Sequence, residues 1–469
     1  DHRFRMGRKT MRFIDLFAGL GGFNLALSEL GHECVFASEI DDTLREVYER
    51  NFGIRPHGDI RRIHADDVPS HDILCAGFPC QPFSKAGEQD GLKDPELGGL
   101  YRDIMRVVRR HRPRFVILEN VPNFEKHNDG KTWKTIERAL KRAGYCVQAR
   151  RLSPHHFAIP QIRDRFYIVA STQSLDYFNW PEPEPNGSMS IRNVLDENPP
   201  DAKKVPEQVE RCLTVWQKFL DHIPKDEKVP HPLWSMEFGA TYPYEDTVPG
   251  QTTIHELRRF KGSHGVTLKG ATDLTDALRL LPSHARPSKR RPNERKFPDW
   301  KVEFIRKNRD FYSRHKGWLD KWIPEISDFP SSFQKLEWNC QGEKVRDIRR
   351  YIIQIRPSGV RVKRPNTAPS LVAMTATQAP IIAWEGRYLT LSECKRLQSM
   401  DKLQRLPSQP SKAYEALGNA VNVEVARKVA GALLATSSDR QLVAAAAHLL
   451  MVPATVKVDS MAQVVVVHT

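Results

Sequence analysis

The chain has 469 residues and a formal net charge of +15, so we expect two or three folded units and a polyanionic partner. No apolar run reaches the roughly 18 residues that cross a bilayer, and the first residues lack the apolar core of a secretion signal. Seven cysteines without a Cys-x-x-Cys pair indicate neither a disulfide framework nor a zinc site. We therefore expect an intracellular protein that needs no metal and no membrane.

Short apolar runs alternate with longer helical patterns from residue 11 to about residue 170. Strands are expected near residues 11–17, 34–38, 72–76 and 115–118, and helices near residues 22–30 and 42–51. This alternation is typical of an α/β fold with a parallel sheet.

A glycine-rich turn, Asp15-Leu-Phe-Ala-Gly-Leu-Gly-Gly22, lies between the first expected strand and the first expected helix. Glycines at such a turn let the backbone approach a ligand. The spacing is not the dinucleotide pattern Gly-x-Gly-x-x-Gly, so the turn alone indicates only a nucleotide-like ligand. Glu39 ends the second strand, where a carboxylate can bind both hydroxyls of a ribose.

One cysteine, Cys80, lies in the segment Gly77-Phe-Pro-Cys-Gln-Pro-Phe-Ser84, directly after the third strand. A loop that leaves the carboxyl end of a buried strand is the ordinary place for a ligand site, and two prolines restrict this one. The position suits an attacking thiolate, provided that the loop or a positive charge lowers the ordinary thiol pKa of about 8.5. The alternative is a small buried hydrophobic residue.

Two further segments carry charged side chains at strand ends. Glu119 follows the apolar run Phe115-Val-Ile-Leu, and burial there would raise its pKa toward neutrality, as a general acid requires. Arg163 and Arg165 are spaced by two residues, which predicts that both project to the same side of an extended segment and reach one pocket. The alternatives are an exposed Glu119 that caps a strand and two solvated arginines.

The composition changes after Thr172, where a Pro-rich stretch begins and the alternation stops. The following region is rich in prolines, aromatic residues and basic residues, and its fold is not readable from the pattern. Residues 256–316 contain 17 Lys or Arg against 7 Asp or Glu, so the positive charge is concentrated there. Near the end, Ser411–Leu434 has the apolar periodicity of one helix.

Together with Arg364-Pro-Asn-Thr-Ala-Pro-Ser370 and Gly418-Asn-Ala-Val-Asn-Val423, these segments resemble the ordered motifs of the C5-cytosine DNA methyltransferases, over roughly half the chain. The resemblance implies a Rossmann-like, S-adenosylmethionine-dependent methyltransferase sheet with a second, smaller irregular DNA-recognition domain. Residues 1–172 and 364–436 would form the catalytic domain and residues 173–363 the target-recognition domain. Residues 437–469 would form a tail without a functional interpretation.

The reaction that the resemblance implies is methyl transfer from S-adenosyl-L-methionine, which leaves S-adenosyl-L-homocysteine, to C5 of a cytosine rotated out of a duplex. Cys80 would attack C6, Glu119 would stabilise the charge at N3, and Arg165 would contact the ring and orient Glu119. Arg163 would lie nearer phosphate.

The cofactor residues expected from the glycine turn, from the second strand and from the resemblance are Asp15, Phe17, Gly19, Leu20, Gly21, Gly22, Glu39, Ile40, Asp59, Ile60, Pro79, Leu100, Asn419 and Val421. From the residues alone, Asp59 could equally be a turn residue.

Contact with double-stranded DNA is expected from two places. Gln81 and Ser84, beside Cys80, would close over the DNA, unless they are ordinary polar loop residues. The basic stretch would supply Arg258, Arg259, Lys289, Arg290 and Arg291 to phosphates, unless these residues are only solvated.

By family habit we expect a monomeric, cytoplasmic, nucleoid-associated enzyme that serves a restriction–modification or phage-defence system. A tRNA cytosine-5 methyltransferase is one alternative, although the long basic insertion argues against it. A DNA-binding regulator that has lost catalysis is another, although Cys80, Glu119 and Arg165 are all present.

Overall fold

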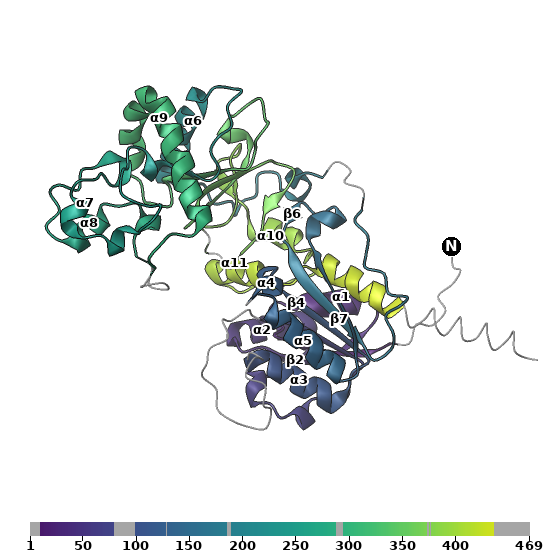
Figure 1. Cartoon of the computed structure of the whole chain (residues 1–469). Coiled ribbons are helices and arrows are strands. Elements are labelled where there is room, and N and C mark those ends of the chain that lie inside the picture. The colour runs from purple at the N-terminus through teal and green to yellow at the C-terminus, as the bar shows by residue number, and fades with distance from the viewer. Residues whose placement is uncertain are drawn as a thin grey trace, which may run out of the picture.

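The computed structural model describes residues 10–78, 99–127, 129–184, 189–287, 294–372, 375 and 377–435. Two lobes are visible in Figure 1. We call the lobe built from the purple and blue elements the N-terminal lobe. The lobe that holds the central teal and green elements is the central lobe.

The N-terminal lobe is built on a six-stranded sheet with the order β2-β1-β3-β4-β7-β5. Its strands are β1 (Arg12–Leu16), β2 (Glu33–Ser38), β3 (Ile73–Gly77), β4 (Phe115–Asn120), β5 (Cys146–Leu152) and β7 (Arg165–Ser171). The first four strands pair in parallel, whereas β7 runs antiparallel to both β4 and β5. The expected α/β fold is confirmed, with one reversed strand that the alternation of runs did not indicate.

Helices cover both faces of this sheet. They are α1 (Gly22–Glu29), α2 (Asp42–Phe52), α3 (Gly99–His111), α4 (Asn123–Lys126) and α5 (Lys131–Arg142). Successive side chains of a strand point to opposite faces, and accordingly Phe13 belongs to the core that includes Phe23 of α1, while Ile14 belongs to the core that includes Ile104 of α3. Burial on both faces explains the continuous apolar runs in the sequence.

The central lobe contains a second six-stranded sheet, with the order β14-β13-β10-β11-β9-β8. Its strands are β8 (Leu233–Trp234), β9 (Lys335–Trp338), β10 (Ile352–Arg356), β11 (Gly359–Lys363), β13 (Ile381–Ile382) and β14 (Arg387–Tyr388). Its helices are α6 (Glu207–His222), α7 (Ile254–Leu257), α8 (Leu274–Arg279) and α9 (Asp299–Ser327). Because β13 and β14 come from residues beyond 363, this sheet crosses the boundary expected there.

The chain passes between the lobes more than once after β11. A two-stranded parallel pair joins β6 (Gln161–Ile162) to β12 (Ala368–Pro369). In Figure 1, α10 (Leu391–Leu397) and α11 (Pro410–Asn419) lie between the two lobes. Within the described ranges, no helix combines the length and the apolarity that a membrane crossing requires.

The expectation of one continuous helix over Ser411–Leu434 is wrong. Helix α11 ends at Asn419, and a second helix begins at residue 423 and continues to residue 435. The Asn422 carboxamide oxygen accepts a hydrogen bond from Val425 N at 3.1 Å, which caps the new helix. Apolar residues are buried on both sides of the break, so the periodicity did not reveal it.

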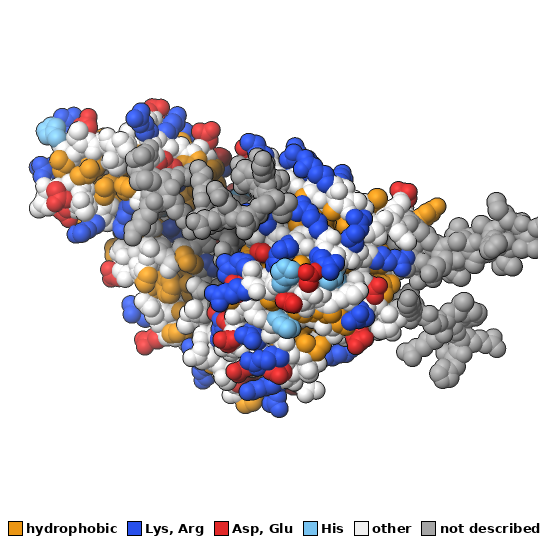
Figure 2. Space-filling view, turned by 90° about the horizontal axis from the view of Figure 1, so that it is seen from below, with side chains coloured by type: hydrophobic (Ala, Val, Ile, Leu, Met, Phe, Trp, Pro, Cys, Tyr) orange, Lys and Arg blue, Asp and Glu red, His pale blue; other side chains and the backbone are white. Residues whose placement is uncertain are grey.

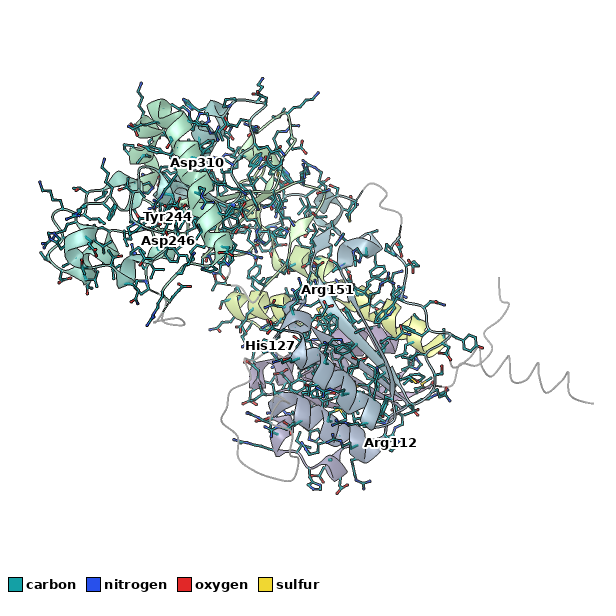
Figure 3. The ribbon with its side chains drawn as sticks, viewed as in Figure 1. Arg112, His127, Arg151, Tyr244, Asp246 and Asp310 are labelled. Atoms are coloured by element: carbon teal, nitrogen blue, oxygen red, sulfur yellow. The ribbon has the colours of Figure 1, made fainter. Side chains whose placement is uncertain are left out.

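A buried carboxylate, Glu237, is the centre of a cluster of polar side chains in the central lobe. Its side chain is fully buried and accepts from Arg309 Nε at 2.9 Å, from His284 Nε2 at 2.6 Å and from the Tyr242 hydroxyl. The Arg309 guanidinium also lies over the rings of Tyr242 and Tyr244, and Figure 3 shows Tyr244 beside α9. Burial opposes ionisation of Glu237, but the His284 hydrogen bond and the Arg309 charge outweigh it and lower the pKa of this carboxyl.

Replacing Glu237 by Gln should therefore destabilise the protein by about 3–5 kcal/mol, because the Arg309 charge would remain buried without its partner. Urea unfolding at neutral pH, followed by tryptophan fluorescence, measures this change. Glu245→Gln is the matched control, because Glu245 pairs with Arg306 at the surface and its loss should leave the midpoint unchanged. Since the pKa of Glu237 is lowered by folding, its contribution is present near neutrality and is lost as the pH falls through that lowered value. Equal unfolding midpoints for the two variants would show that the buried Glu237–Arg309 pair does not stabilise the fold.

Candidate active site

The carboxyl ends of four parallel strands meet at one edge of the first sheet. Phe17 follows β1, Glu39 follows β2 and Phe78 follows β3. Glu119 is the last but one residue of β4. Because parallel strands end on the same side, this edge is where an open α/β sheet binds its ligands. The structure thus brings together three of the expected residues, Phe17, Glu39 and Glu119, from separate parts of the sequence.

The glycine turn after β1 has the backbone conformation that glycine favours. Phe17, Gly19 and Gly21 have φ values of 58°, 54° and 83°, and Gly21 is the N-cap of α1. Glu39 holds this turn, because its Oε2 accepts from Gly19 N at 2.9 Å while its Oε1 accepts from Asp41 N at 2.9 Å. One carboxylate therefore joins the ends of β1 and β2.

Val421 packs against this turn from the far end of the chain. A Cβ at Gly22 would lie 2.5 Å from the Val421 carbonyl oxygen, and a Cβ at Gly77 would lie 3.1 Å from Val421 Cγ2. Close approach of the Val421 backbone therefore requires glycine at position 22, and it leaves little room for a larger residue at position 77. Asn419, at the end of α11, is exposed beside this contact.

Asp15 lies beneath the turn and is only 1 % exposed. Its Oδ2 accepts from the Tyr48 hydroxyl at 3.3 Å, and Tyr48 in turn accepts from Asn24 Nδ2 at 2.8 Å. Burial raises the pKa of Asp15 well above its ordinary value. The carboxyl group thus joins β1 to Tyr48 of α2, and the ligand contact expected for Asp15 stays a prediction.

The remaining expected cofactor residues flank the end of β2. Ile40 is 65 % exposed, whereas Ile60 is buried. The Asp59 carboxylate caps a short 3₁₀ turn, Ile60–Arg62, and pairs with Arg61 Nη2 at 2.6 Å, as a turn residue would. Leu100 lies in the first turn of α3, and α3 reaches this segment through the hydrogen bond from Arg106 Nη2 to Ile60 O at 2.8 Å.

Glu119 has the environment of a buried acid. Its side chain is 9 % exposed, and its Oε1 lies 2.9 Å from Arg165 Nε. Burial raises the pKa of Glu119, and the nearby charges of Arg165 and Arg163 oppose part of this increase. A Cβ at Gly77 would lie 3.7 Å from Glu119 Oε2, so the acid faces the end of β3. The alternative of an exposed carboxylate that caps the strand does not describe this residue.

Arg163 corrects one expectation. It is 2 % exposed, and its guanidinium donates to Leu371 O, to Gly418 O at 2.8 Å and to Ala420 O at 2.9 Å. A side chain that is buried among backbone carbonyls is not available to a phosphate. Arg163 therefore ties β6 to the C-terminal segment, while Arg165 alone pairs with Glu119.

Several expected residues lie outside the described part of the chain. They are Pro79, Cys80, Gln81, Ser84, Lys289, Arg290 and Arg291. Phe78 is the last described residue before Cys80, and its carbonyl accepts from Asn120 Nδ2 at 3.0 Å. The sequence pattern assigned Asn120 no role, although its place directly after Glu119 was the available signal.

The two described arginines of the basic stretch differ. Arg258 and Arg259, the described members of the expected phosphate contacts, are both exposed. The Arg258 guanidinium donates to Ala271 O at 2.7 Å and so holds the loop that precedes α8, whereas Arg259 follows the end of α7. Figure 2 shows Lys and Arg side chains interspersed with Asp and Glu on the face that it presents. Net charge alone does not mark a single binding surface there.

A family model, C-5 cytosine-specific DNA methylase, matches residues 11–435. The chain belongs to this family of methylases. The match includes the strand ends that carry Glu39 and Glu119 and the C-terminal segment that carries Val421, so family membership and geometry point to the same edge of the sheet.

Curated relatives agree with the family. The type II methyltransferase M.HhaI of Haemophilus parahaemolyticus is 46% identical over 175 residues, which cover 37% of this chain and 53% of the relative. M.MspI of Moraxella sp is 43% identical over 40% of this chain and 44% of the relative. Over these matches the chain spans about half the length of the relative. M.AluI of Cellulosimicrobium cellulans is 30% identical over 89% of this chain and 90% of the relative.

Proposed function

We propose that this methylase is a DNA (cytosine-5-)-methyltransferase that modifies C5 of a cytosine rotated out of a short duplex sequence, through a covalent bond between Cys80 and C6. The observation that carries the proposal is the buried Glu119–Arg165 pair, because a carboxylic acid with a raised pKa is the group that this reaction needs at N3 of cytosine. The acid faces the end of β3, and Cys80 follows β3 by three residues in the sequence.

The chain supplies one residue for the attack at C6 and another for the proton at N3. The Cys80 sulfur forms a bond to C6 while Glu119 donates its proton to N3, so the ring becomes an enamine that is nucleophilic at C5. Arg165 fixes the orientation of Glu119 through their 2.9 Å contact. After C5 takes the methyl group, a base removes the C5 proton and the bond from C6 to the Cys80 sulfur breaks, which releases the thiolate. N3 then returns its proton to the Glu119 carboxylate, so the aromatic ring and the acid are both restored.

The residues at the strand ends fit S-adenosylmethionine, which would supply the methyl group. A Cβ at Gly19 would meet no atom within 4 Å, so the turn leaves space where a ligand can approach the backbone. Glu39 lies beside this space with its carboxylate already oriented by Gly19 N and Asp41 N, as recognition of ribose hydroxyls requires. We propose Phe17, Ile40, Ile60, Leu100, Asn419 and Val421 as further walls of this pocket, with Asp59 at its edge.

Gly22→Ala should weaken cofactor binding about tenfold or more, because the new methyl group collides with the Val421 carbonyl and displaces one wall of the pocket. Calorimetric titration with S-adenosylhomocysteine measures this affinity. Gly317→Ala is the control, because a Cβ at Gly317 in α9 meets nothing within 4 Å. Unchanged affinity in Gly22→Ala would show that Val421 does not line the pocket.

The central lobe is our candidate for target recognition. Residues 173–363 carry the basic stretch in which Arg258, Arg259 and Lys289–Arg291 would contact phosphates, and Gln81 and Ser84 would close over the DNA beside Cys80. We propose that residues 1–172 and 364–436 form the catalytic domain, apart from β13 and β14, which pair in the sheet of the central lobe. We also propose that the enzyme acts as a monomer and serves a restriction–modification system.

Bisulfite sequencing tests the proposed activity directly. The chain is expressed in a bacterial host that lacks DNA methylation, and genomic DNA is compared with that of the same host carrying an empty vector. We expect protected cytosines in one short sequence and none in the control. Absence of protected cytosines, while the purified protein still binds duplex DNA, would reject the proposed reaction on DNA.

A further inference from the structure

Val421 lies where the helical path of the C-terminal segment is interrupted. Helix α11 ends at Asn419, the next helix begins at residue 423, and Val421 lies between them. The last carbonyls of a helix have no hydrogen-bond donors within the helix. At a buried helix end, these donors must come from other parts of the chain. The hydrogen bonds that hold this break therefore decide where Val421 is placed.

Gln398, the C-cap of α10, holds the break on both sides of Val421. Its side-chain Nε2 donates to Leu417 O at 2.6 Å, and its backbone oxygen accepts from Val423 N at 3.1 Å. The side chain is fully buried. One residue of α10 thus spans the segment from Leu417 to Val423.

Arg163 completes this arrangement from the N-terminal lobe. Its Nη2 donates to Gly418 O and Ala420 O, so its positive charge lies at the C-terminus of α11, where the helix dipole favours it. Gln161 adds a hydrogen bond from its Nε2 to Leu397 O at 2.7 Å, and Asn422 Nδ2 donates to the same carbonyl at 3.0 Å. The break is fully tied to α10 and β6.

We propose that Gln398 is a positioning residue for the cofactor pocket: with Arg163 it caps α11 and holds Val421 against Gly22 and Gly77. This inference rests on the proposed cofactor site. It extends that site to a side chain on α10 that touches neither cofactor nor substrate and acts only through the placement of Val421.

Gln398→Met tests the proposal, because methionine keeps the length of the side chain and removes only the amide. We expect affinity for S-adenosylhomocysteine, measured by calorimetry, to fall about tenfold, since Leu417 O loses its buried donor. In steady-state assays the KM for S-adenosylmethionine should rise by a similar factor, with kcat within about twofold at saturation. Loss of a merely structural contact would lower the active fraction and leave KM unchanged.

The matched control is Gln334→Met in the central lobe. Gln334 is 8 % exposed and its Nε2 donates to Ser327 O at 3.0 Å and Phe329 O at 2.5 Å, so it loses a comparable buried amide away from the first sheet. If Gln398→Met does not fold, Gln398→Asn, which keeps an amide but is one methylene too short to reach Leu417 O, is titrated in its place. A folded Gln398 variant that binds S-adenosylhomocysteine as tightly as wild type overturns the proposal. A wild-type protein that fails to bind it overturns the proposed cofactor site as well, and so distinguishes the two failures.

Discussion

Replacing Cys80 with serine should abolish methylation, with a loss of more than about 10³-fold in rate. A serine hydroxyl does not ionise near neutral pH and cannot attack C6, and without the bond to C6 the cytosine C5 is too weak a nucleophile to accept a methyl group. Transfer of a radiolabelled methyl group to duplex DNA measures the rate. DNA binding should persist, because the substitution changes one atom.

Cys146→Ser is the matched control for that experiment. Cys146 is a free, exposed cysteine at the start of β5, so its loss should not change the rate. A duplex with 5-fluorocytosine at the target position adds a second readout. A base cannot remove fluorine from C5 as it removes a proton, so the bond between the Cys80 sulfur and C6 should persist. Wild type should therefore form a denaturation-resistant complex with this duplex, and Cys80→Ser should not. Methylation by Cys80→Ser above about one-tenth of the wild-type rate would remove Cys80 from the mechanism.

Glu119→Gln should lower kcat by about 10²–10⁴-fold, the usual range for a general acid. Glutamine keeps the shape of the side chain beside Arg165 but cannot pass a proton to N3. Glu125→Gln, which changes a half-exposed carboxylate paired with Arg151, is the control and should be nearly neutral. Arg151 lies on the same lobe in Figure 3.

The catalytic role of Glu119 also predicts how kcat depends on pH. Burial raises the pKa of Glu119, so the protonated acid persists to higher pH than for an exposed carboxyl, and kcat should fall as the pH rises through that raised pKa. Glutamine does not titrate, so the variant should lose this alkaline decrease. A variant that keeps the same alkaline decrease would assign it to a different group.

Parts of the site were predictable because they depend on local sequence. The ends of β1, β2 and β4 follow apolar runs that can be read directly, and Glu39 and Glu119 were placed correctly at those ends. Arg163 was not, because a spacing of two residues gives the direction of a side chain in an extended segment but not what covers it. Its partners Leu371, Gly418 and Ala420 are more than 200 positions away in the chain.

The central lobe was the least predictable part for a related reason. Strands β8, β13 and β14 are two residues long, too short for any periodicity. β8 pairs with β9 through Leu233 and Leu336, which are far apart in sequence. Glu237 looked like any charged residue of a polar loop. Only packing placed it at the centre of a buried cluster with Arg309 and His284.

The sequence by itself determined the order along the chain of the first four strands and the first two helices, the chemistry available at the strand ends and the family. These features are local: apolar runs, glycine turns and a cysteine between two prolines act through neighbouring residues. The tertiary structure alone decided that buried Asp15 pairs with Tyr48 of α2, that Arg163 caps α11, and that Val421 closes against Gly22 and Gly77. Those assignments depend on which backbone carbonyls and side chains burial brings together, and burial is a property of the folded chain rather than of any segment of it.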